Sequence, residues 1–466
     1  MIGTITGSEA ASSLPAQAGN EAPDDDESAK VPALAWYGLA VLLMTTLFAF
    51  VVRQMLSLIA PSLQTSLAFT DLQIGMLQGL GMAIFASIAS YPMGWLADRF
   101  GRRLILAIGI ACWSLATAVC GFQSSFGGLF VGTIGIAIGE AGLAPIIFAM
   151  IPDLFPERKR NTANLIFYGG SMLGAGLGMA LGGATLQWLA GAQSSLPEWL
   201  AGIDTWRIAM VAVALPGPLF FLLVITMPLG RKPALQTPVG TVHKREMVDF
   251  LPYAKVHWRT LITVFGSIFA MGVAMQAGMI WFPLALPRAF GIDPTTVGVN
   301  LGTAIVAATL IGILLPGLAL KFWRGAAERG SLRIALIFIG LTPLPAAFLP
   351  FVTSPLQAYV IAALQGAMGV AASALMPGVL QDLAPPHLRS RVLALLGITN
   401  ALALAVSPLA IGALSGLIIG PRGMLQAITI VTLPSLIASA VLIALAPRPF
   451  AATVQAIQSR QSKEDL

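Results

Sequence analysis

Two ionisable side chains lie deep inside long apolar runs of this 466-residue chain, Arg53 in the run 33–61 and Glu140 in the run 126–152. Each such charge costs roughly 2.5–3.5 kcal/mol at the centre of a membrane helix, so these residues are rarely idle. A carboxylate can neutralise a guanidinium, and protonation of the carboxylate would free the guanidinium for an anionic ligand. We therefore predict that Arg53 and Glu140 pair and face a central cavity, either as a structural salt bridge or as a proton-sensitive switch.

The histidines, cysteines and short motifs of the chain add no further candidates to the predicted site of Arg53 and Glu140. The histidines His243, His257 and His387 fall in polar segments, which leaves Glu140 as the buried candidate for proton binding. Cys112 and Cys120 lie in one apolar run at a spacing too long for a disulfide. The sequence carries no nucleotide-binding loop, metal-ligand cluster or nucleophile constellation, so we expect no enzyme activity, no cofactor and no metal.

The composition predicts the elements that must position Arg53 and Glu140. Hydrophobic residues make up 57% of the chain and charged residues 10%, whereas soluble domains carry roughly 25% charged residues. Twelve apolar runs are long enough to span a bilayer. We predict an all-α polytopic membrane protein with twelve transmembrane helices, at 33–61, 72–97, 104–122, 126–152, 163–190, 207–229, 260–287, 296–321, 332–350, 355–381, 392–419 and 424–446.

The distribution of basic residues predicts the topology. All but four of the 26 Lys and Arg residues fall in loops and tails on one side of this arrangement, and the exceptions are Arg53, Arg207, Arg288 and Arg422. Cytoplasmic loops are enriched in such residues, so we expect both termini in the cytoplasm. Because the net charge of +6 follows the membrane topology, we expect the lipid bilayer and not a nucleic acid as partner.

The chain divides into two halves. The polar segment 231–259 separates six runs from six, and the motif Asp153-Leu154-Phe155-Pro156 after the fourth run returns as Asp382-Leu383-Ala384-Pro385 after the tenth. We predict a disordered cytoplasmic tail (1–30), an N-terminal six-helix bundle (31–229), a cytoplasmic linker (230–259), a C-terminal six-helix bundle (260–446) and a cytoplasmic C-terminal tail (447–466). Paired bundles with a site near the midplane are typical of alternating-access transporters.

The loop Gly94-Trp95-Leu96-Ala97-Asp98-Arg99-Phe100-Gly101-Arg102-Arg103 joins the second and third runs. Its pattern G-x-L-x-D-R-x-G-R-R resembles the loop between helices 2 and 3 of the major facilitator superfamily. The resemblance implies a cytoplasmic gate in which Asp98, Arg99 and Arg102 lock the two halves together when the outer face is open. Gly94 would allow a helix to approach and Gly101 a chain reversal. The alternative is a basic loop that only sets the topology.

Within the superfamily the chain is similar to the spinster-type transporters. The likeness is carried by Gly75-Met76-Leu77-Gln78, Gly139-Glu140-Ala141, Ile166-Phe167-Tyr168, Trp281-Phe282-Pro283 and Ser407-Pro408, and by Arg53 eight residues before Pro61. It implies a proton-coupled transporter of amphipathic or lipid-like substrates such as lysophospholipids or sphingoid lipids. Val52 and Thr133 stand where the family has an Asp and an Arg, so that proton coupling is either lost in this chain or carried by Glu140 alone.

The seventh run offers further cavity residues. Gln276, with Met275 and Trp281, is predicted to give a polar contact within an apolar cavity wall, or else to pack between helices. Two other functions stay open: a proton-coupled carboxylate transporter anchored by Arg53, and a membrane sensor that does not transport. We expect a monomer in the bacterial inner membrane.

Glycines mark one face of the fifth run. Gly170, Gly174, Gly178 and Gly182 recur every fourth residue and drift only about 40° per step around a helix. In a membrane, small residues at this spacing allow a partner helix to pack closely. We predict either a face that slides during transport or a static packing face.

Overall fold

The structure of the chain is a computed structural model. It describes residues 33–192, 202–227, 252–322, 330–385 and 388–464, together with Pro197 and Phe250. The predicted N-terminal tail and most of the predicted linker lie outside these residues.

The N-terminal bundle is formed by the first six spans, and α2 (Ala60–Leu67) is a short helix after the first of them. The spans are α1 (Ala33–Leu58); α3 (Asp71–Met76), η1 (Leu77–Gly81) and α4 (Met82–Phe100); α5 (Arg102–Cys120); α6 (Phe126–Ala141) and α7 (Leu143–Leu154); α8 (Glu157–Met172) and α9 (Gly174–Ala192); α11 (Thr205–Ala214) and α12 (Gly217–Thr226).

The C-terminal bundle is formed by six further spans, five of which are single helices. Its spans are α14 (Trp258–Phe290); α15 (Pro294–Phe322); α16 (Gly330–Leu341), α17 (Pro343–Ala347) and η3 (Leu349–Phe351); α18 (Pro355–Asp382); α19 (Arg389–Ser415); and α20 (Gly423–Leu445). A last helix, α21 (Pro447–Glu464), covers most of the predicted C-terminal tail.

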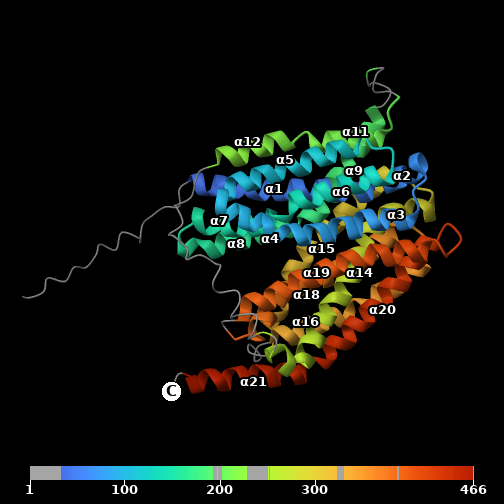
Figure 1. Ribbon diagram of the computed structural model, residues 1–466. Helices are drawn as coiled ribbons and strands as arrows, with labels where there is room; N and C mark the ends of the chain where they lie inside the picture. Colours follow the sequence, from blue (N-terminus) through green and yellow to red (C-terminus); the bar gives the residue numbers. More distant parts are fainter. Residues whose placement is uncertain are drawn as a thin grey trace, which may run out of the picture.

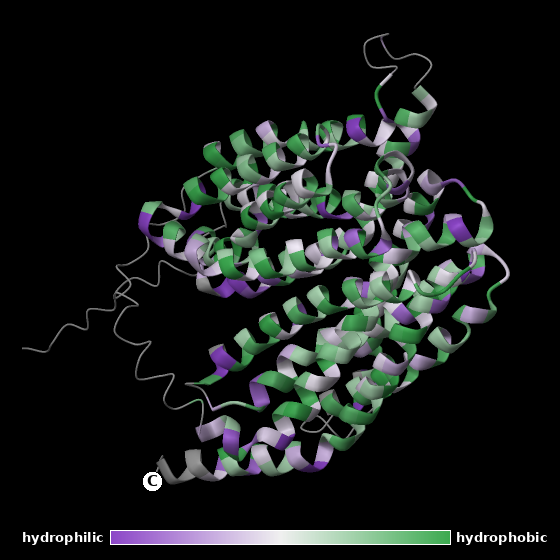
Figure 2. Cartoon of the chain, turned by 45° about the vertical axis from the view of Figure 1, so that its right-hand side comes forward, coloured by the Kyte–Doolittle hydropathy of each residue, from purple (hydrophilic) through white to green (hydrophobic). Residues whose placement is uncertain are grey.

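The predicted fold class is confirmed. Among the described residues, eleven spans are long and apolar enough to cross a membrane, and α8 with α9, bent by 43°, completes a twelfth. Figure 2 shows hydrophobic residues along the spans and hydrophilic residues at their ends and on α21. The protein is an integral membrane protein whose described part is helical.

Local sequence explains several helix boundaries. Thr70 and Ser354 each begin a span with a capping box, in which Gln73 and Gln357 return the hydrogen bond three residues later. Gly101 has φ 103°, which glycine adopts at little steric cost, and it separates α4 from α5 as the loop motif predicts. Such boundaries fix the depth at which each side chain enters the membrane.

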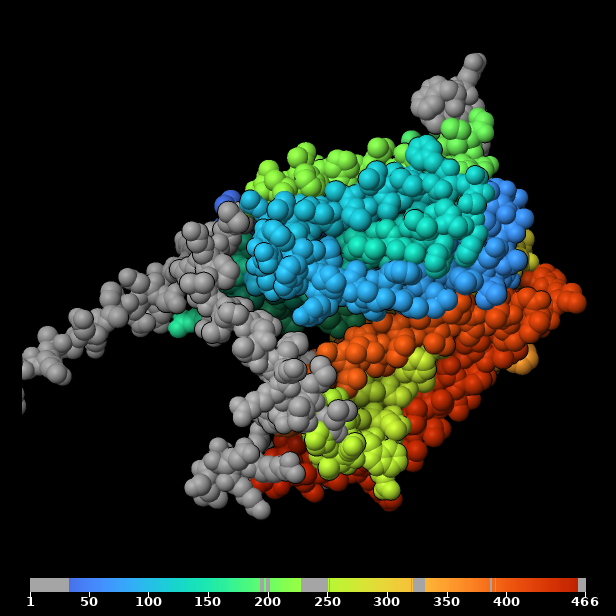
Figure 3. All heavy atoms as spheres, in the orientation of Figure 1, coloured from blue at the N-terminus to red at the C-terminus, as the bar shows by residue number. Residues whose placement is uncertain are grey.

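The two bundles meet at one end and diverge at the other (Figure 1 and Figure 3). We call the divergent end the basic end, because it carries the loop with Arg99 and Arg102 and the starts of α8, α14 and α19. The opposite end, which carries α2 and the loop between α14 and α15, is the far end. The largest hydrophobic cluster of the described residues is continuous across the far end, from α1 of the first bundle to Trp281 of α14 in the second.

The predicted glycine face packs within the N-terminal bundle. A Cβ on Gly178 would lie 2.7 Å from the backbone carbonyl of Phe50, and Gly174 and Gly182 likewise face Phe50 and Leu58 of α1. The partner of this glycine face is therefore α1 of the same bundle.

A second glycine face, which the sequence analysis missed, joins the two bundles. Gly183 of α9 lies against Gly298 of α15, where an added Cβ would be 2.7 Å from the partner backbone, and Gly176 lies against Gly302 in the same way. A similar close approach occurs where Gly75 meets the carbonyl oxygen of Pro408 in α19. These seams close the far end.

Candidate functional site

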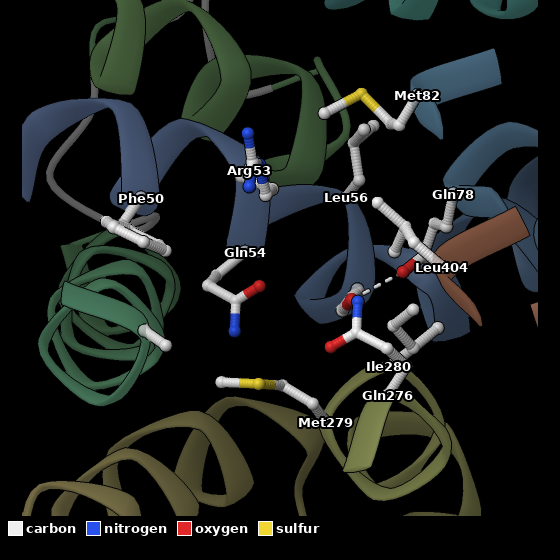
Figure 4. A pocket seen from close by; sticks show the side chains of 12 residues that line it. Phe50, Arg53, Gln54, Leu56, Gln78, Met82, Gln276, Met279, Ile280 and Leu404 are labelled. Carbon is white, nitrogen blue, oxygen red and sulfur yellow. Dashed lines mark hydrogen bonds between the residues drawn. The ribbon is translucent and has the colours of Figure 1, made fainter. Parts of the chain in front are cut away.

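A cavity of about 120 Å³ lies between the bundles. It takes residues from α1, η1, α4 and α9 of the first bundle and from α14 and α19 of the second. Figure 4 shows the side chains of Gln54 and Gln276 directed into the space between α1 and α14. The lining residues are Phe50, Arg53, Gln54, Leu56, Ser57, Gln78, Met82, Ala175, Gln276, Met279, Ile280 and Leu404.

Arg53 and Glu140 form an ion pair beside this cavity. The Arg53 Nη2 atom donates to Glu140 Oε2 at 2.5 Å and Arg53 Nε donates to the same oxygen at 3.1 Å. The Arg53 side chain is 43% exposed and lines the cavity, whereas the Glu140 side chain is 2% exposed and lies behind it. The structure thus brings the predicted pair together, and Arg53 alone reaches the cavity surface.

The surroundings of the pair hold both side chains in place. Glu140 stands near the end of α6, and Gly139 allows α5 to approach so closely that a Cβ there would lie 2.7 Å from the Trp113 nitrogen. On the other side, the Phe50 ring lies 5.7 Å from Arg53 Cζ, within the range of a cation–π interaction. Glu140 Oε1 has no hydrogen-bond partner among the described residues. One carboxylate oxygen therefore remains available to a proton.

Two glutamines that the sequence analysis did not select add polar groups to the cavity. Gln54 and Gln78 are each 6% exposed, and their amide nitrogens have no partner within the described part of the chain. The Ser57 hydroxyl donates to Gln78 Oε1. Gln78 lies in η1, a single π-helical turn within the second span, and such turns are frequent at functional sites. Unfilled buried donors of this kind favour a ligand with hydrogen-bond acceptors.

Only one of the three predicted residues of the seventh span lines the cavity. Gln276 does, but Trp281 is fully buried in the hydrophobic cluster and Met275 packs toward Gly369 of α18. Met279 and Ile280 form the apolar wall instead. The prediction for Met275 and Trp281 was wrong because it fixed the span but not the direction in which each side chain points.

A polar network links the bundles at the far end, and we call it the far-end latch. Arg288 of α14 donates to both carboxylate oxygens of Asp71, at 2.6 and 3.1 Å, and also to Gln64 Oε1. Asp71 also accepts hydrogen bonds from Gln64 Nε2 at 2.6 Å and from Ser415 Oγ of α19 at 2.8 Å. The latch therefore joins α2 and α3 to two helices of the other bundle.

The predicted gate motif stays within the N-terminal bundle in this conformation. Arg102 Nη1 donates to Asp153 at 2.7 Å, and Arg102 Nη2 lies 3.6 Å from Asp98, whose side chain is 67% exposed. Arg99 lies over the Trp95 ring, and no atom of the described residues lies within 4 Å of a Cβ built on Gly94. The predicted close approach at Gly94 is absent from this conformation, because the basic end is the divergent one.

Comparison with known proteins gives the family. Residues 42–408 match the profile of the Major Facilitator Superfamily. The chain is 26% identical over 387 residues to an MFS-type efflux pump of Mycolicibacterium smegmatis, covering 82% of this chain and 85% of the pump. It is 28% identical over 262 residues to the sphingosine-1-phosphate transporter SPNS2 of Mus musculus, covering 55% of this chain and 44% of that protein.

The fold is also found among solved structures. A bacterial homolog of the human lysosomal transporter Spinster, in an inward-facing and unoccupied conformation, matches with a TM-score of 0.69 and 21% identity, covering 92% of this chain and 99% of the other. The xylose transporter XylE of E. coli, in an inward-open conformation, matches with a TM-score of 0.62 and 16% identity, covering 87% and 95% of the two chains. The relatives and structural neighbours are transporters and not enzymes. The chain belongs to the Major Facilitator Superfamily and resembles its spinster-type members.

Proposed function

We propose that this membrane transporter is secondary active and works by alternating access. The cavity shared by the two bundles, the divergent basic end and the far-end latch support this proposal. We further propose that the basic end faces the cytoplasm, with both termini on that side of a bacterial inner membrane, and that the protein works as a monomer. The distribution of Lys and Arg supports the orientation.

We propose that proton binding at Glu140 controls the availability of Arg53. A protonated Glu140 loses its charge and most of its attraction for the guanidinium, so Arg53 is freed to turn into the cavity. Loss of the proton restores the pair and displaces the anionic group from Arg53. The buried position of Glu140 and the half-exposed position of Arg53 support this order of events.

The proposed substrate is amphipathic and carries an anionic headgroup, as a lysophospholipid or a sphingoid-lipid phosphate does. Arg53 and the amides of Gln54 and Gln276 would bind the headgroup, and Met279 and Leu404 would contact an acyl chain. A relative named a sphingosine-1-phosphate transporter agrees with this class. The second candidate is a small carboxylate, favoured by a single exposed guanidinium in the cavity.

The ion pair between Arg53 and Glu140 at the cavity is the observation that carries the proposal. A thermal-shift screen of the purified protein with lysophospholipids, sphingoid bases and small carboxylates tests the substrate class. A ligand present at 100 times its Kd stabilises the folded state by about 2.7 kcal/mol. We expect lysophospholipids to raise the unfolding temperature and Arg53→Gln to abolish the effect, whereas Arg422→Gln, at the far end, retains it.

The outcomes separate the candidates. Stabilisation by carboxylates alone would favour the second candidate. Stabilisation by a lysophospholipid that persists in Arg53→Gln would remove Arg53 from the binding site and contradict the proposal.

A further inference from the structure

A second hollow lies outside the transport cavity, at the basic end of the C-terminal bundle. It is formed where α14 begins and where the chain passes from α20 into α21 (Figure 1). Thr453 of α21 holds the two sides together, because its hydroxyl lies 3.0 Å from His257 Nδ1 and 2.9 Å from Thr260 Oγ1. We call this hollow the elbow groove. These contacts fix its shape by tying α21 to the start of α14.

The elbow groove is positively charged. Arg259 lines it from α14 and Arg448 from α21, and both side chains are exposed. Neither arginine has a carboxylate partner among the described residues, although Arg53, Arg102 and Arg288 all do. Exposed guanidinium groups without a carboxylate partner are free to donate to a phosphate.

The groove also lies at the boundary of the membrane spans. The span of α14 begins at Trp258 and the span of α20 ends at Leu445, so both arginines lie next to the end of a span, where lipid headgroups are expected. Ile262 and Leu445 line the groove on its membrane side and are 55% and 60% exposed. The groove thus has cations at headgroup level and apolar side chains beside them, toward the hydrocarbon.

We propose that the elbow groove binds an anionic glycerophospholipid. The two guanidinium groups would hold the phosphodiester of the headgroup, and an acyl chain would lie along Ile262 and Leu445. The charge selects an anionic headgroup over a zwitterionic one, and the apolar wall selects a lipid over a free phosphate ion. The site is separate from the transport cavity, because the two share no lining residue.

Native mass spectrometry of the full-length protein tests the site. The purified protein is titrated with phosphatidylglycerol or phosphatidylethanolamine, and retained lipid is counted. A basic residue near an anionic lipid contributes about fivefold to binding, so Arg259→Gln/Arg448→Gln should weaken phosphatidylglycerol retention by about 25-fold. Ala452→Trp, which fills the groove without changing its charge, should also lower retention.

The matched control removes the same charge elsewhere. Arg158→Gln/Lys159→Gln neutralises two exposed cations at the basic end of the other bundle and should leave retention unchanged. Three results would overturn the proposal. The two charge variants could lose phosphatidylglycerol retention equally, or the wild-type protein could retain the two lipids equally. Inorganic phosphate could also displace all of the bound phosphatidylglycerol. Thermal unfolding of every variant confirms that it is folded.

Discussion

Asp71 and Arg288 are 217 residues apart in the sequence, yet their side chains join the two bundles through hydrogen bonds of 2.6 and 3.1 Å. The Asp71 side chain is 12% exposed and the Arg288 side chain 33%, so the carboxylate of the pair lies largely out of water. Any state in which the far end opens must separate α3 from α14 and α19, and it must therefore break this pair.

Removing the latch should shift the conformational equilibrium toward the far-open state. A hydrogen bond to a charged partner contributes about 1.5–3 kcal/mol, so Arg288→Gln should lower the ratio of closed to open molecules by about tenfold or more. Spin labels at Thr65 and Thr353, exposed at the far end of the two bundles, measure the opening as a longer distance. Asp71→Asn should lengthen the distance in the same way, and the double variant Asp71→Asn/Arg288→Gln should show little further change.

Arg422 supplies the control for this experiment. It also lies at the far end, where its guanidinium stands 6.0 Å from the Phe290 ring, and it has no ion pair in the described part of the chain. Arg422→Gln should leave the distance distribution unchanged. If Arg288→Gln also leaves it unchanged, the latch does not hold the far end closed.

The glycine seam between α9 and α15 should not tolerate a methyl group. A Cβ on Gly302 would lie 2.7 Å from the Ala180 Cα atom, and backbone cannot rotate away as a side chain can. Overpacking of this kind costs roughly 1–3 kcal/mol, so Gly302→Ala should lower the thermal unfolding temperature.

Gly317 gives the matched comparison on the same helix. A Cβ there would meet no atom of the described residues within 4 Å, so Gly317→Ala should keep or slightly raise the unfolding temperature through its better helix propensity. If Gly302→Ala and Gly317→Ala change the unfolding temperature equally, the seam can accommodate a methyl group and the prediction is wrong.

Tyr253 should make stability depend on pH in the alkaline range. Its hydroxyl donates to the Leu383 carbonyl at the end of α18, and burial raises its pKa to about 12. The unfolded pKa is about 10, so the folded state holds this proton more tightly. The stabilising contribution is therefore complete below about pH 10 and is lost as the pH rises toward 12.

Thermal unfolding measured at a series of pH values from about pH 8 to about pH 11 follows this contribution. Tyr253→Phe should unfold at a lower temperature at pH 8, because the Leu383 carbonyl loses its donor, and its stability should fall less steeply above about pH 10. Parallel pH curves for wild type and variant would exclude the titration of Tyr253.

The fold could be predicted from the sequence because hydropathy alone marks helices that must cross a bilayer. The pair of Arg53 and Glu140 could be predicted for a related reason, since a charge inside the membrane needs a partner and few charges were available. The pair of Asp71 and Arg288 could not be predicted in this way, because charged residues are common at the ends of membrane spans. Nothing in the sequence at these two positions indicates that they meet.

The sequence could not determine in which direction a side chain points from its helix, or which helices pack against each other. The spacing of Gly174 and Gly178 gave the correct face of the helix but could not say whether the partner was in the same bundle. Trp281 lies in the hydrophobic core and not in the cavity. Gln54 was not predicted as a cavity residue, because a neutral amide costs less in a membrane than a charge and so indicates a functional site less strongly. Such choices depend on tertiary packing.

Transport driven by a pH gradient in liposomes tests the central role of Glu140 most directly. Glu140→Gln keeps the shape of the side chain but cannot release a proton, so gradient-driven substrate accumulation should fall to the level of liposomes without protein while exchange at equal pH continues. Asp204→Asn, which breaks an ion pair with Arg207 at the far end, should transport like the wild type. Undiminished gradient-driven accumulation by Glu140→Gln would contradict the proposed coupling.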